Sequence, residues 1–180
     1  MDILAHALWV GAGVSLARRR WSLTSATVAT TVILSALPDV PHILPIVGWW
    51  LGGDGTWATL RAYAIAVPGQ EPAVPALVEL WSHNLHCVMH SAVVAGVVTL
   101  VCGALLRTFW VPLLGWWSHI VIDVFTHSVE YYPVRVLYPL SERAFDGLAW
   151  NTPWFLALNY GVLAATWLWM RRTKGRHHAD

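Results

Sequence analysis

The chain has 180 residues, a mass of 20.0 kDa and a formal net charge of +1, with 57% hydrophobic and only 12% charged residues. Soluble domains carry roughly 25% charged residues. The composition therefore excludes a disordered chain, a coiled coil and a basic nucleic-acid-binding module, and no nucleic acid is expected as a partner. Together with 13 Trp, it predicts an integral membrane protein whose partners are membrane lipids.

Five apolar stretches follow one another along the chain, at residues 3–17, 23–37, 91–106, 109–126 and 154–170. A spanning helix needs about 20 apolar residues, so the first two stretches are short. Residues 40–51 contain Pro41 and Pro45 and are expected to form a re-entrant or interfacial piece. The pattern predicts an all-α polytopic membrane protein with about four or five membrane-embedded helices, in one domain that covers residues 1–180.

Basic residues predict the orientation of these helices. If the helices alternate, most Arg and Lys residues, including Arg18, Arg107 and those of the tail at 171–180, fall on one side of the membrane. By the positive-inside rule this side is cytoplasmic, so the N-terminus faces out and the C-terminus faces in. Residues 52–82 and 128–151 are then external loops, the first with a short helix near residues 57–66.

Ionisable residues occur within the apolar stretches. His119, Asp123 and His127 follow one another at spacings of four, which places them along one helical face. Burying a lone ionised Asp costs several kcal/mol or more, so such groups pair with one another or bind an ion. The alternative that stays open is a structural His119–Asp123 pair that locks two helices together.

Further ligand-type residues come from three other segments. His6 lies one turn into the first stretch, Asp39 at the outer end of the second, and His90 about two turns into the membrane from the outer side. These residues, with His119 and Asp123, would meet in the outer half of the membrane and hold a divalent metal. Mixed His and Asp ligands favour Zn²⁺, with Mn²⁺ or Fe²⁺ as alternatives.

A metal at this depth predicts hydrolysis by a metal-activated water. His42 or Asp123 would take the proton, and Arg135 or Arg143 on the external loop would orient an anionic headgroup. His86 and His127 would support the ligands or contact substrate. A site at headgroup depth favours an ester or phosphoester of a lipid or lipid-linked substrate. The alternatives are a metal transporter or channel and a non-catalytic membrane scaffold.

An ordered set of motifs resembles one known family. The motifs lie at residues 1–7, 36–42, 90–91, 115–119 with Asp123, 126–128, 138–141 and 145–147. They resemble the inner-membrane-associated, metal-dependent hydrolases, some of which are described as LexA-binding and which are distantly similar to zinc-dependent phospholipase C. Many members carry His-Arg before their Thr-His-Ser motif, whereas here the run is residues 83–91, without Arg. The resemblance implies a metal-dependent hydrolase of the inner membrane and names no substrate. With the orientation that the basic residues predict, its metal site would face the non-cytoplasmic side.

Overall fold

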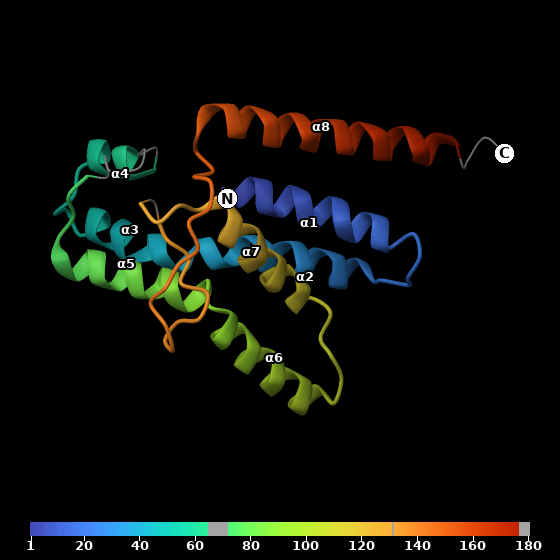
Figure 1. Ribbon diagram of the computed structural model, residues 1–180, viewed down its shortest axis with the longest axis horizontal. Helices are drawn as coiled ribbons and strands as arrows, with labels where there is room; N and C mark the ends of the chain where they lie inside the picture. The colour runs from blue at the N-terminus through green and yellow to red at the C-terminus, as the bar shows by residue number, and fades with distance from the viewer. Residues whose placement is uncertain (65–71, 131, 177–180) are drawn as a thin grey trace.

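The structure is a computed structural model that describes residues 1–64, 72–130 and 132–176. Within these ranges it is helical and contains no β-strand, which confirms the all-α prediction. Figure 1 shows the helices in chain order. They are α1 (Ile3–Ala17), α2 (Ser25–Ala36), the 3-10 helices η1 (Leu37–Asp39) and η2 (Pro41–Ile43), α3 (Leu44–Leu51), α4 (Trp57–Ala64), α5 (Ala76–Met89), α6 (Ala92–Leu106), α7 (Leu113–Thr126) and α8 (Pro153–Arg176).

Helix α2 lies at the centre and packs against both α1 and α7 (Figure 1). The close approach of α7 depends on Gly115, where an added Cβ would lie 2.0 Å from the carbonyl oxygen of Thr31 and 3.1 Å from the backbone nitrogen of Ser35. Only glycine allows the two backbones to come so near. This contact brings the polar face of α7 to the end of α2.

Helix α8 runs along α1 at one edge of the molecule (Figure 1). The indole of Trp9 donates a hydrogen bond of 2.8 Å to Asn159, and the hydroxyl of Tyr160 donates one of 2.7 Å to Asp2. Asp2 is also the N-cap of α1, because its carboxylate accepts from the backbone N–H of Ala5. The start of α1 is therefore fixed from two sides.

The second predicted stretch is longer than the sequence indicates. Helices α2, η1, η2 and α3 form one helical run, Ser25–Leu51, of 27 residues. Pro38 and Pro41 tighten this run into 3-10 turns instead of ending it, since a proline at the first turn of a helix loses no hydrogen bond. The separate re-entrant piece predicted at residues 40–51 is thus a continuation of α2, and Asp39 lies within the run rather than at its end.

The third predicted stretch, residues 91–106, corresponds to α6, and a bend separates it from the helix before it. Helices α5 and α6 meet at an angle of 57°, and α5 begins at Ala76, inside the predicted external loop 52–82. The break lies at His90 and Ser91, and the Ser91 hydroxyl caps α6 by accepting from the backbone N–H groups of Val93 and Val94. The short helix expected near residues 57–66 corresponds to α4, although residues 65 and 66 lie outside the described ranges.

We expect Ser91→Ala to lower the stability of the protein by about 1–2 kcal/mol, because it removes this cap. The same hydroxyl also donates to the backbone carbonyl of Tyr138, so the loss should be near the upper end of that range. Thermal unfolding in detergent, followed by circular dichroism, measures the change. Ser91→Thr keeps a hydroxyl and should recover most of the stability, whereas equal losses in both variants would contradict the capping role.

Few of the described helices satisfy the length and hydropathy that a membrane crossing requires. The run Ser25–Leu51 does so alone, and the bent pair α5–α6 does so if it forms one span. Helices α1 and α7 are apolar but have only 15 and 14 residues. The described part of the chain therefore contains one or two candidate spans, fewer than the four or five predicted. Helix α8 continues to Arg176, into the predicted tail 171–180, and residues 177–180 lie outside the described ranges.

Candidate metal centre

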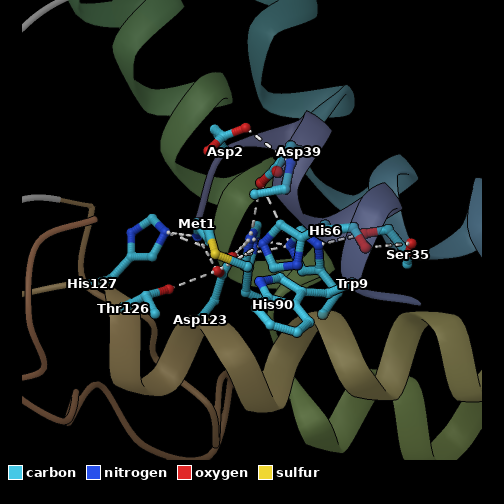
Figure 2. Close-up of polar contacts among 12 residues, drawn as sticks. Met1, Asp2, His6, Trp9, Ser35, Asp39, His90, Asp123, Thr126 and His127 are labelled. Atoms are coloured by element: carbon cyan, nitrogen blue, oxygen red, sulfur yellow. Dashed lines mark hydrogen bonds and ion pairs between the residues drawn. The ribbon is translucent and has the colours of Figure 1, made fainter. Parts of the chain in front are cut away.

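Two imidazoles and two carboxylates converge at the junction of four helical segments. Asp39 comes from η1, His90 from the break between α5 and α6, and His119 and Asp123 from one face of α7. All four are buried, and one ligand atom from each lies within 4.8 Å of the others. Figure 2 shows Asp39, His90 and Asp123 directed toward one another. We refer to Asp39, His90, His119 and Asp123 as the four-residue cluster.

Backbone hydrogen bonds orient both imidazoles of the four-residue cluster. The Nδ1–H of His119 donates to the carbonyl of Ser35 at 2.7 Å, and the Nδ1–H of His90 donates to the carbonyl of His86 at 2.9 Å. A carbonyl oxygen can only accept, so each Nδ1 carries a proton and each ring directs its Nε2 inward. Histidines that bind metals are held by the same kind of hydrogen bond on the opposite nitrogen.

The two oxygens of Asp123 have different surroundings. Oδ1 faces donors, because it contacts the α-amino group of Met1, accepts from the Thr126 hydroxyl at 3.2 Å and lies 2.9 Å from His6 Nε2. Oδ2 has no hydrogen-bond partner, although it is buried and lies 3.2 Å from His90 Nε2. Unpaired lone pairs from neutral imidazoles and carboxylates at such distances repel one another unless a cation or protons lie between them.

The spacing of these atoms fits a tetrahedral cation. The two Nε2 atoms are 2.9 Å apart, and their distances to the oxygens of Asp39 and Asp123 are 3.1–3.5 Å. With arms of about 2.1 Å, the length typical of zinc bound to imidazole or carboxylate, a tetrahedron has edges of about 3.4 Å. The donor set and these five distances therefore fit Zn²⁺, and the sixth distance, between the two carboxylates, is within 4.8 Å. Mn²⁺ and Fe²⁺ accept the same donors.

His6 lies beside the four-residue cluster and is fully buried. Its ring stacks on His119 with centroids 3.8 Å apart, and its Nε2 contacts the Oδ1 atom of Asp123, on the side that faces the donors. The structure thus brings His6 to the predicted site, as a neighbour of the cluster that contacts Asp123. Its Nδ1 has no hydrogen-bond partner in the protein.

His127 follows the end of α7 and contacts the same carboxylate. Its Nδ1–H donates to the carbonyl of Tyr132 at 2.9 Å, and its Nε2 lies 3.1 Å from the amino nitrogen of Met1 and 3.5 Å from Asp123 Oδ2. Burial, reinforced by the positive charge of that amino group, lowers the pKa of His127 to about 3. The ring is therefore neutral at physiological pH, and its Nε2 accepts from the amino group of Met1.

His42 and His86 line a cavity that reaches the four-residue cluster. His86 is buried and stacks on His90 at 4.0 Å, and the His42 ring meets His86 edge-on at 5.4 Å. A cavity of about 420 Å³ is lined by both histidines together with Asp39 and His127. We refer to it as the Asp39 cavity. A larger cavity of about 710 Å³ shares His86 but contains no member of the four-residue cluster.

Neither predicted arginine lies at the cluster. Arg135 forms an ion pair of 3.0 Å with Glu142 and contacts His83 and Cys87, while Arg143 is exposed. Neither arginine lines the Asp39 cavity. The expected role of these residues in orienting an anionic headgroup therefore has no support in their positions, because their charges are held outside the cavity wall.

Several contacts that shape the site are not evident from the sequence. Thr126 reaches Asp123 from one turn away, a spacing that could have identified it. The carbonyls of Ser35 and His86, in contrast, carry no side-chain signal. The segment after residue 146 also fixes the end of α7, since the N–H groups of Gly147 and Trp150 donate to the carbonyls of His127 and Thr126. An added Cβ at Gly147 would lie 2.5 Å from the carbonyl oxygen of Phe125.

Comparison with known proteins gives one match. The family model described as YdjM inner membrane protein matches residues 1–179, which is nearly the whole chain. No curated protein and no solved structure shows a significant match. The description of the family names a membrane and no reaction.

Proposed function

This chain belongs to the YdjM inner membrane protein family, and on that premise we propose that it is an integral membrane, metal-dependent hydrolase of an ester or phosphoester. The observation that carries the proposal is the four-residue cluster, in which two buried imidazoles and two buried carboxylates converge beside a cavity. Backbone carbonyls hold the Nδ1–H groups of both imidazoles, so both Nε2 atoms are directed at the two carboxylates.

Asp39, His90, His119 and Asp123 would hold one divalent ion, with Zn²⁺ first and Mn²⁺ or Fe²⁺ as alternatives. When bound, such an ion would polarise the ester or phosphoester group and lower the pKa of water, so that water can act as the nucleophile near neutral pH. The carbonyls of Ser35 and His86 hold the two imidazoles in the required orientation. The donors on Asp123 Oδ1 hold that carboxylate so that Oδ2 stays directed at the cluster.

His42 is the group best placed to move a proton. It lines the Asp39 cavity, and its buried Nδ1 has no hydrogen-bond partner among the described residues. An imidazole nitrogen with a free lone pair can accept the proton of the attacking water and pass it to the leaving group. Asp123, the second candidate from the sequence, already contacts six neighbouring groups.

Orientation in the membrane follows from the basic residues. Arg18, Arg107 and Arg171 lie near helix ends that would face the cytoplasm. The N-terminus, the four-residue cluster and the external loops would then face the non-cytoplasmic side. The short apolar helices α1 and α7 and helix α8 would lie in the membrane with the one or two candidate spans, which would give the four or five embedded helices that the sequence predicts.

Metal-loaded protein in detergent provides the test, with nitrophenyl esters, a bis-nitrophenyl phosphodiester and phospholipid vesicles as substrates. We expect His42→Ala to lower kcat about 100-fold while bound metal stays unchanged. His83→Ala, which alters an exposed histidine outside the Asp39 cavity, should keep full activity. Protein that retains its metal yet cleaves none of these substrates would refute the hydrolase proposal, and metal flux in proteoliposomes would then indicate transport.

A further inference from the structure

The Asp39 cavity is lined by buried polar residues at one end and by exposed apolar residues at the other. At its inner end lie Asp39, His86 and His127, with exposures of 7%, 4% and 5%. At its outer end lie Ile3 and Leu4 of α1, which are 38% and 58% exposed. A polar, buried end that contains a metal-ligand candidate is therefore continuous with an apolar, open end.

The walls between the two ends are mainly apolar. Ile43 of η2, Leu60 and Ala64 of α4, and Trp150 line the cavity, together with Met1, Asp2, Tyr63 and Tyr132. None of the lining residues is Lys or Arg. A volume of about 420 Å³ lies within the roughly 300–1,000 Å³ range of small-molecule sites. The cavity is thus shaped for an apolar group of a ligand whose reactive group reaches the inner end.

Because the protein belongs to a membrane family, the bilayer is the nearest source of an apolar group for this cavity. The chain belongs to an inner membrane family, and Leu4 is an exposed apolar side chain at the cavity. An opening lined by Ile3 and Leu4 would admit an acyl chain directly from the bilayer, without transfer through water. A water-soluble substrate would instead meet two exposed apolar side chains at the entrance, which gives it no favourable contact.

We propose that the Asp39 cavity binds one acyl chain of a bilayer lipid, which enters sideways between the start of α1 and helix α4. This inference rests on the proposed function, because it assigns the substrate of the same site. The acyl chain lies against Ile3, Leu4, Leu60 and Ala64, and the ester or phosphoester group reaches Asp39 and His42. The substrate is therefore a membrane lipid that is cleaved from within its leaflet.

Photo-cross-linking tests the binding step without turnover. The protein is reconstituted in nanodiscs with a phosphatidylethanolamine that carries a diazirine on one acyl chain, and adducts are mapped by mass spectrometry. We expect adducts on Ile3, Leu4, Ile43 and Leu60. Ala64→Phe fills the cavity and should reduce these adducts about tenfold, whereas Ala62→Phe, on the same helix but outside the lining, should leave them unchanged.

Each outcome decides between the two proposals. Adducts confined to the outer surfaces of α6 and α8, or equal labelling in the two Phe variants, would overturn lateral binding and leave the hydrolase proposal standing. Labelling by a diazirine fatty acid but not by the phospholipid would also overturn it, because the occupant would then be a free fatty acid. Specific labelling in protein that cleaves no ester would support chain binding while refuting hydrolysis.

Discussion

Asp123→Asn is expected to weaken metal binding at least about 100-fold, because it removes the carboxylate shared by most groups of the site. Asp123 Oδ2 lies 3.2 Å from His90 Nε2 and 3.1 Å from His119 Nε2. The substitution preserves the size of the side chain, so the helices should keep their packing. The asparagine amide offers one oxygen without a full negative charge, and a buried cation then lacks half of its balancing charge.

Competition with a chromophoric chelator measures this affinity in detergent. Asp54→Asn is the matched control, because Asp54 is exposed and lies outside the four-residue cluster. Circular dichroism should show equal helix content in the wild type and both variants. An unchanged metal affinity in folded Asp123→Asn protein would mean that Asp123 is no ligand.

Gly115→Ala is expected to destabilise the protein by about 3 kcal/mol or more. The added Cβ would lie 2.0 Å from the carbonyl oxygen of Thr31, so α7 must move away from α2. That movement would carry His119 from its hydrogen bond with Ser35 and Asp123 from its neighbours. Loss of stability and loss of bound metal should therefore occur together.

Thermal unfolding in detergent should show a midpoint about 10 °C lower in Gly115→Ala, as a loss of this size implies for a domain of 180 residues. Gly96→Ala is the matched control, because Gly96 lies in helix α6 and its added Cβ would meet no atom within 4 Å. Alanine there should raise stability slightly, by up to about 1 kcal/mol. A Gly115→Ala protein as stable as the wild type would contradict the close contact of α2 and α7.

The spacing on α7 is the part of the site that local sequence predicts best. Residues four apart on a helix share a face, and the structure places His119 and Asp123 side by side with Nε2 and Oδ2 3.1 Å apart. The burial cost of a carboxylate then predicts partners from other segments. The structure brings Asp39 and His90 to that face, and His6 beside it.

Helix boundaries around the site were harder to predict, because a proline can either end a helix or occupy the first turn of one. Pro38, Pro41 and Pro45 favour the end of a helix in the sequence, yet here they occupy first turns of successive helical pieces. Pro75 similarly precedes α5 within a segment expected to be a loop. His90 was expected inside a helix and instead lies at a 57° break.

The tertiary neighbours of the long side chains could not be predicted at all. An external Arg135 suggests a headgroup contact, but Glu142, seven residues away, holds it at 3.0 Å. Loop conformation decides such pairing, and no periodicity describes a loop. The number of membrane-embedded helices also depends on how short apolar helices such as α1 pack, which hydropathy alone does not determine.

The metal content of the purified wild-type protein tests the cluster most directly. After incubation with Zn²⁺, Mn²⁺ or Fe²⁺ and removal of excess ion, mass spectrometry should find about one equivalent of metal per chain, as expected for a single four-ligand site. A His90→Ala, His119→Ala double variant should retain none. Folded wild-type protein that retains none of the three ions would contradict the metal site, and the cluster would then be a protonated His–Asp contact that joins α7 to its neighbours.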